Sequence, residues 1–177
     1  MIVVSNTSPI NYLILIDFEH LLPSLFGSVI IPTAVRLELE APGAPQRVRE
    51  MVGTSGWIEV RSPTRIDPRL MALGAGEREA LAMAHELKAD LVLLDETRGR
   101  RAAAALSLNV VGTLDVIDRA ARRGLVDAGD AVARLRKTTF RASPRLLDGV
   151  ARSSTKLLPN VGRNSVDQPE TGDTKES

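Results

Sequence analysis

Residues 2–9 of the chain read IVVSNTSP, and this stretch decides the fold. The run at residues 2–5 is almost wholly apolar, which is typical of a strand buried on both faces of a sheet. Ser8 and Pro9 then indicate a helix start, because a hydroxyl side chain caps a helix and proline fits its first turn. A buried strand that passes directly into a helix is typical of an α/β fold.

The same alternation continues along the chain. Further strands are expected at residues 29–31, 57–60, 91–94 and 109–111. Helices are expected at residues 8–16, 18–25, around 35–39, and at 44–54, 77–84, 97–106, 114–123, 127–137 and 144–152. Strands that alternate with helices imply right-handed crossovers. The predicted fold class is α/β, a three-layer α/β/α architecture with a mainly parallel five-stranded sheet.

Length and composition set the domain organisation. The chain has 177 residues, 44% of them hydrophobic, which suits one globular domain. Residues 153–177 are rich in Ser, Thr, Asn, Gly, Pro and charge. Such a segment buries too little apolar surface to offset the entropy lost on ordering. We therefore expect a domain at residues 1–152 and a disordered tail at residues 153–177.

Composition also excludes several functional classes. The chain has no Cys and two His, which excludes disulfides and thiolate metal sites and argues against zinc chemistry. No signal stretch begins the sequence, and no apolar run approaches the ~18 residues of a membrane span. We expect a cytoplasmic protein without a membrane partner.

The charge is distributed unevenly. Residues 1–90 carry 8 basic and 11 acidic residues, a net charge of −3, whereas residues 91–152 carry 12 and 7, a net charge of +5. An acidic region beside basic helices suits a polyanion such as nucleic acid. Ordinary solvated helix faces are the alternative interpretation. Aromatic residues make up only 3% of the chain, which argues against recognition on an aromatic platform.

Oxygen-bearing side chains follow two of the predicted strands. Asn6 comes directly after the first strand, and Asp95 and Glu96 come after the fourth. The carboxyl ends of parallel strands meet at one edge of a sheet, where sites form. The segments between them add Glu38, Glu77 and Glu79. Four or five oxygen ligands at one point would suit a hard divalent cation such as Mg²⁺.

Each of these residues also has a purely structural interpretation. Asn6 and Asp95 are good helix caps. Glu77 and Glu79 lie in the first turn of a helix, where the helix dipole favours negative charge. Glu38 could be an ordinary surface residue. The joint pattern is harder to explain structurally, because a parallel sheet brings these separated segments to one edge.

Two other enzyme classes fit the strand ends poorly. Asp95 after a buried strand superficially resembles the nucleophile of haloacid-dehalogenase-like phosphatases, but those enzymes need a second Asp where this chain has Thr97. Dinucleotide binding needs a glycine-rich loop after the first strand. Residues 6–9 read NTSP instead, so neither class is favoured.

Five segments carry a resemblance to a known family: VVSNTSP at residues 3–9, IPTAVRLEL at 31–39, GAGEREA at 74–80, ADLVLLDE at 89–96 and VGTL at 111–114. With these segments the chain resembles the PIN-domain proteins over roughly residues 1–150. This nuclease family includes the VapC toxins of toxin–antitoxin pairs. Within it, the chain is most similar to a branch that begins with Asn/Asp-Thr-Ser-Pro.

The resemblance implies a ribonuclease that uses Mg²⁺ or Mn²⁺ held by a carboxylate cluster. It further implies a toxin with RNA as its substrate, a cognate antitoxin protein as its partner, and a homodimer. The alternative is a degenerate PIN domain that binds RNA or a protein partner without cleaving RNA.

The family's functional positions carry over residue by residue. Asn6 stands where the family usually has its first Asp, and Glu38 takes the second acidic position. The third is Glu79, with Glu77 as competitor, and the fourth is Asp95, with Glu96 as competitor. Ser8 matches a hydroxyl that could position a metal-bound water. The candidate RNA contacts are Arg98, Arg100 and Arg101.

Asn6 is the departure from the family pattern. An Asn side chain offers a metal one carbonyl oxygen and no negative charge. Its presence should weaken Mg²⁺ binding, although it could also relieve repulsion among the carboxylates of an empty site.

Overall fold

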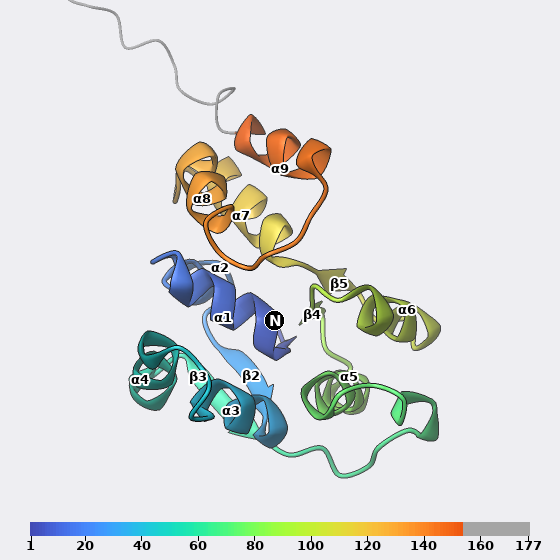
Figure 1. The fold of residues 1–177 in the computed structure, drawn as a ribbon. Coiled ribbons are helices and arrows are strands. Elements are labelled where there is room, and N and C mark those ends of the chain that lie inside the picture. The colour runs from blue at the N-terminus through green and yellow to red at the C-terminus, as the bar shows by residue number, and fades with distance from the viewer. Residues whose placement is uncertain (154–177) are drawn as a thin grey trace, which may run out of the picture.

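The computed structural model describes residues 1–153, and its centre is a sheet of five parallel strands (Figure 1). The strands lie in the order β3-β2-β1-β4-β5. Their bounds are β1 Val3–Ser5, β2 Val29–Pro32, β3 Ile58–Arg61, β4 Leu91–Leu93 and β5 Val110–Val111. All four pairings are parallel, so the predicted mainly parallel sheet is confirmed.

Helices connect the strands and continue beyond the last one. The connecting helices are α1 Thr7–Leu15, α2 Leu21–Phe26, α3 Thr33–Glu40, α4 Gln46–Thr54, α5 Ala75–Leu87 and α6 Thr97–Ala105. After β5 come α7 Thr113–Arg122, α8 Ala128–Leu135 and α9 Pro144–Ala151, which gather at one end of the molecule (Figure 1). Within residues 1–153, no helix is long and apolar enough to span a bilayer.

Alternate side chains of β1, β2, β4 and β5 enter two separate cores. Val3 packs in the core that also holds buried residues of α1 and α7, whereas Val4 packs in the core with α5 and α6. The strand β2 alternates in the same way, with Ile31 in the first core and Ile30 in the second. Both faces of the sheet are therefore covered, and the predicted three-layer α/β/α fold class is confirmed.

The order of the strands fixes where a site can form. The chain runs outward from β1 through β2 to β3, then returns to the other side of β1 with β4 and β5. Side chains that follow β1 and β4 therefore meet at a topological switch point, where open α/β sheets form crevices. The register pairs Ser5 with Leu93, so the two strands end at the same level.

Most predicted elements are confirmed, with different ends. The helix expected at residues 18–25 begins only at Leu21. The later start follows from Asp17, because its backbone φ of 66° lies outside the right-handed helical region. The chain then turns back, and the Phe18 amide donates to the Leu13 carbonyl. The tail predicted at residues 153–177 lies, apart from Ser153, outside the described residues.

Candidate functional site

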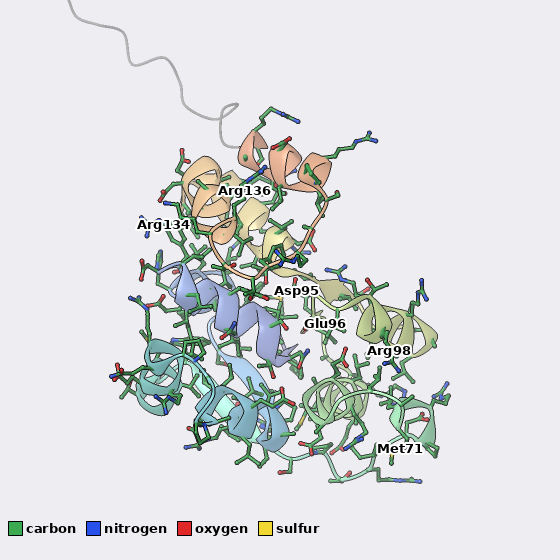
Figure 2. All side chains as sticks on the ribbon, viewed as in Figure 1. Met71, Asp95, Glu96, Arg98, Arg134 and Arg136 are labelled. Carbon is green, nitrogen blue, oxygen red and sulfur yellow. The ribbon has the colours of Figure 1, made fainter. Side chains whose placement is uncertain are left out.

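Four segments that are distant in sequence bring polar side chains to the carboxyl edge of the sheet. Asn6 follows β1, and Glu96 is the residue before α6. Glu38 comes from the last turn of α3 and Glu77 from the first turn of α5. Figure 2 labels Glu96 with its neighbour Asp95 after the end of β4.

Asn6 is a buried polar residue with one half of its amide unused. Its side chain is only 3% exposed. The Asn6 Nδ2 donates to Glu96 Oε2 at 3.1 Å, whereas Asn6 Oδ1 has no hydrogen-bond partner in the described part of the chain. Asn6 occupies the N-cap position of α1, but its side chain makes no capping hydrogen bond to that helix. A buried carbonyl oxygen without a donor is costly unless a ligand or water satisfies it.

Glu96 and Asp95 are neighbours with different surroundings. The Glu96 carboxylate accepts hydrogen bonds from the Ser8 hydroxyl and the Asn6 amide. The Asp95 carboxylate instead accepts from the Thr113 amide at 2.8 Å and the Thr113 hydroxyl at 2.6 Å, at the start of α7. Burial raises the pKa of Asp95, and the Thr113 bonds oppose that rise. Both Asp95 oxygens are thus already engaged by the fold.

Glu38 is held between two other segments. It accepts a hydrogen bond from the Thr7 hydroxyl, and its Oε1 accepts from the Gly76 amide at 2.9 Å. A Cβ on residue 76 would lie 2.6 Å from Glu38 Oε2. Glycine at this position lets the carboxylate approach the helix backbone closely.

Glu77 carries the second unsatisfied oxygen of the group. Its Oε2 accepts weakly from the Gly74 amide at 3.4 Å, whereas its buried Oε1 has no partner within residues 1–153. Burial raises the pKa of Glu77, and the charges of Glu96 and Glu38 raise it further. Arg98 acts in the opposite direction. The three carboxylates therefore affect one another electrostatically.

Glu79 has a different environment from Glu77, although only one residue separates them. Its Oε2 accepts from the Ala34 amide at 3.1 Å, in the first turn of α3. A carboxylate at this position accepts from a helix amide that has no partner within the helix. The positive end of the helix dipole also stabilises its negative charge. Of the six metal-ligand candidates, Asn6, Glu38, Glu77 and Glu96 are connected by hydrogen bonds or by charge, and Asp95 also interacts electrostatically with Glu96, whereas Glu79 binds the Ala34 amide of α3.

The grouped side chains form an all-oxygen set held by hydroxyl and amide donors. Within residues 1–153, no three acidic or histidine side chains are already arranged around a common metal position. Such carboxylates repel one another without a cation and relax onto nearby donors. Among residues 1–153, three buried side-chain oxygens lack a hydrogen-bond partner, and two of them, on Asn6 and Glu77, belong to this set. Their chemistry fits a cation, because hard divalent ions bind carboxylate and carbonyl oxygen.

The predicted RNA-contact arginines differ in their availability. Arg98 donates to the Ala72 carbonyl at 2.9 Å, and Figure 2 shows it on α6 beside the site. Arg100 lies 3.5 Å from Asp115 Oδ2 in an ion pair. Arg101 is exposed.

A hollow of about 240 Å³ lies beside Asn6, Glu38, Glu77 and Glu96, which we call the acidic group. Most of the residues that line the hollow are not among the candidates predicted from the sequence. Ser8, Asp95, Glu96 and Thr97 form one side, and the others are Tyr12, Thr139, Phe140 and Arg141. The sequence could have predicted Tyr12 as a lining residue, because Tyr12 lies one helical turn after Ser8 and therefore shares its face of the helix. Nothing near residues 139–141 marks them, because only the tertiary fold brings them here.

Comparison with known proteins gives one match. A family model described as a PIN domain matches residues 2–156, which include every segment of the acidic group. No curated protein and no solved structure matches the chain.

Proposed function

This chain belongs to the PIN-domain family, whose members are generally metal-dependent nucleases, and from this premise we propose that it is a Mg²⁺- or Mn²⁺-dependent ribonuclease. The observation that carries the proposal is the pair of buried oxygens without donors, on Asn6 and Glu77, among three interacting carboxylates. Such oxygens cost stability in the empty site, and a cation would satisfy them.

The residues proposed to hold the ion are Glu38, Glu77, Glu96 and the Oδ1 of Asn6. A divalent ion in such a set stabilises the charge that develops on the scissile phosphate and activates a water for attack. Asp95 and Glu79 are then supports, of α7 and α3 respectively, rather than ligands. For the third acidic position of the family this proposal selects Glu77 instead of Glu79. For the fourth it selects Glu96 instead of Asp95.

The chain's own groups orient the site and move a proton. The Thr7 and Ser8 hydroxyls donate to Glu38 and Glu96 and fix the direction of these carboxylates. Glu77, whose buried Oε1 has no hydrogen-bond partner among residues 1–153, is the carboxylate of the three with an oxygen left to accept a proton. RNA approaches from the side of the basic α6, where Arg98 and Arg101 are candidate contacts to the backbone.

The proposal is tested with purified protein and a labelled single-stranded RNA, in EDTA and with Mn²⁺ or Mg²⁺. We expect metal-dependent cleavage, and a loss of roughly a hundredfold or more in Glu38→Gln and Glu96→Gln, since even residues that support metal ligands are worth 10–100-fold. Glu40→Gln is the matched control, because Glu40 lies on the same helix and pairs with Arg36. Cleavage that persists in EDTA, or equal rates in all three variants, contradicts the proposal.

We extend the proposal to a toxin of a toxin–antitoxin pair that acts as a cytosolic homodimer. The support is the resemblance of residues 3–9 and 89–96 to the PIN-domain family, which includes the VapC toxins. Expression of the wild type should then arrest growth, Glu38→Gln should not, and co-expression of a small protein encoded next to this chain should restore growth. Normal growth on wild-type expression contradicts the toxin role but not the ribonuclease.

One observation favours a second candidate, a PIN domain that binds RNA or a protein without cleavage. Asn6 supplies no charge at the first ligand position, and it already donates to Glu96. On this alternative, Mn²⁺ should leave the thermal stability of the protein unchanged, whereas a metal enzyme should gain stability.

A further inference from the structure

The hollow beside the acidic group is built from both ends of the described chain. Ser8, Tyr12 and Glu96 come from the core α/β unit, and residues 139–141 come from the loop between α8 and α9. Ser8 and Glu96 are also hydrogen-bonded to each other within the acidic group. Whatever occupies the hollow therefore lies directly beside the proposed site of cleavage.

The wall formed by residues 138–141 is held in place by several contacts. The Tyr12 hydroxyl lies 3.3 Å from the Thr139 hydroxyl, and the Tyr12 and Phe140 rings meet edge to face with centroids 5.0 Å apart. The Thr138 hydroxyl donates to the Leu135 carbonyl and accepts from the Phe140 amide. These contacts join the loop to α1 and α8, so the hollow has a preformed wall.

The wall presents a cation that the fold does not use. Arg141 is exposed, and among the described residues it has no carboxylate within ion-pair distance. By contrast, Arg134 on α8 binds Asp130, and Arg136, directly after α8, binds Asp148. An arginine without an acidic partner, next to an acidic site, is suited to bind a phosphate by paired hydrogen bonds.

The size and lining of the hollow select the kind of occupant. Its volume of about 240 Å³ lies below the ~300–1,000 Å³ of most small-molecule sites, so it suits one unit of a polymer. The chain has one Tyr and three Phe, and the hollow gathers the tyrosine and one phenylalanine. Aromatic side chains contact unpaired bases, which duplex RNA does not offer.

We propose that this hollow binds the nucleotide next to the scissile phosphate of a single-stranded RNA. Arg141 holds its phosphate, and Tyr12 and Phe140 contact its base or ribose. This inference rests on the proposed ribonuclease function, but it concerns binding and can be tested without cleavage. Arg141 is a substrate-positioning residue in this arrangement and takes no part in bond breaking.

Binding of a 5′-fluorescein-labelled single-stranded 12-nucleotide RNA of mixed sequence, measured by anisotropy in EDTA over a series of salt concentrations, tests the proposal. We expect Arg141→Ala to weaken binding about tenfold, as for a lost hydrogen bond to a charged group. It should also reduce the slope of log K against log salt by about 0.7, the value for one phosphate of a single strand. Arg145→Ala is the matched control, since this exposed arginine lies four residues away and lines a different hollow.

A second measurement locates the RNA directly. The same RNA containing 4-thiouridine is crosslinked to the wild-type protein by light, and the adduct is mapped by mass spectrometry. A crosslink in the peptide of residues 138–141 supports the proposal. Equal affinity and salt slope for Arg141→Ala and Arg145→Ala overturn it, as does wild-type protein that binds no RNA. Wild-type protein that binds RNA with the expected Arg141 effect but shows no metal-dependent cleavage overturns only the ribonuclease proposal.

Discussion

Glu77→Gln should make the metal-free protein more stable and the metal-bound protein less stable. In the empty site, Glu77 has a buried oxygen without a donor, and Glu38 and Glu96 repel its charge. The substitution removes that charge with almost no change in shape. With a divalent ion present, the same charge becomes an attraction, so the substitution removes a ligand. Opposite effects in the two conditions are the expected signature of a metal site.

The magnitude in EDTA follows from the removal of a charge that two neighbouring carboxylates repel, which costs about 1–4 kcal/mol per pair at ~4 Å between water-like and protein-surface dielectrics. Glu77 is only partly buried, so we expect the low end, about 1 kcal/mol. In a domain of this size, that raises Tm by roughly 2–4 °C. With Mn²⁺ at ~100 times its Kd, the wild type should gain about 2.7 kcal/mol, and the variant should gain clearly less.

The pH dependence has a defined sign. The pKa of Glu77 is raised in the folded protein, so the folded state binds this proton more tightly than the unfolded state does. The cost of ionising Glu77 is thus absent below the ordinary glutamate pKa and appears as the pH rises through the raised value. The advantage of Glu77→Gln in EDTA should therefore be full at pH 7–8 and disappear near pH 4.

Thermal melts of wild type, Glu77→Gln and Glu79→Gln, each in EDTA and in Mn²⁺, decide the matter. Glu79→Gln is the matched control, because its carboxylate caps α3 through Ala34. We expect it to lose about 0.5–1 kcal/mol in EDTA and to keep the full Mn²⁺ gain. If Glu77→Gln lowers Tm in EDTA, or if it gains as much from Mn²⁺ as the wild type, the assignment of Glu77 to the metal site is refuted.

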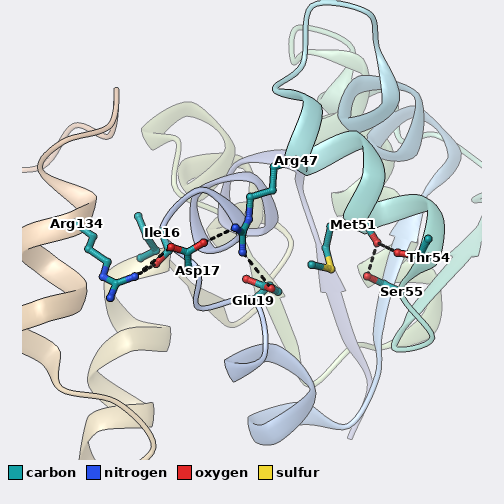
Figure 3. Close-up of polar contacts among 8 residues, drawn as sticks. All are labelled: Ile16, Asp17, Glu19, Arg47, Met51, Thr54, Ser55 and Arg134. Carbon is teal, nitrogen blue, oxygen red and sulfur yellow. Dashed lines mark hydrogen bonds and ion pairs between the residues drawn. The ribbon is translucent and has the colours of Figure 1, made fainter.

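Three further substitutions test other parts of the structure. Asn6→Asp replaces the donor to Glu96 by a second carboxylate, so calorimetry should show tighter Mn²⁺ binding and melts in EDTA should show a lower Tm; equal affinity would place Asn6 outside the site. Asp95→Ala removes both acceptors of Thr113, and we expect a loss of about 2 kcal/mol in urea unfolding, whereas an unchanged midpoint would show that α7 does not need this cap. Asp17→Asn keeps the left-handed backbone but breaks the ion pairs to α4 and α8 in Figure 3, and should cost about 1 kcal/mol at low salt and less at 1 M salt.

The sequence predicts the sheet because each strand has a separate local signal. Short apolar runs end at polar residues, and the alternation with helices leaves few possible topologies. The sequence also predicts the edge at which Asn6 and Glu96 meet, because that edge follows from strand direction alone. The prediction fails at the ends of short helices such as α2, where a left-handed residue at Asp17 interrupts a sequence that otherwise looks helical.

The sequence cannot decide between neighbouring carboxylates. Residues two apart on a helix point about 200° apart, so Glu77 and Glu79 cannot share one site, but either could face it. The proposed choice of Glu77 rests on the first turn of α3, whose Ala34 amide binds Glu79. The proposed choice of Glu96 rests in the same way on Thr113, which binds Asp95. These partners lie 45 and 18 residues away, and no local pattern reveals such contacts.

Under the proposed function, Asn6 would explain how the site remains folded without an ion. An Asp at this position would face Glu96 across a buried contact, which is the least favourable arrangement for two carboxylates. The amide of Asn6 turns this repulsion into a hydrogen bond through Nδ2 and still leaves Oδ1 free for a cation. If the proposed metal site is correct, this exchange would lower the charge available to the ion and raise the stability of the empty protein. Weaker metal binding and a more stable empty site would then have the same origin in this one side chain.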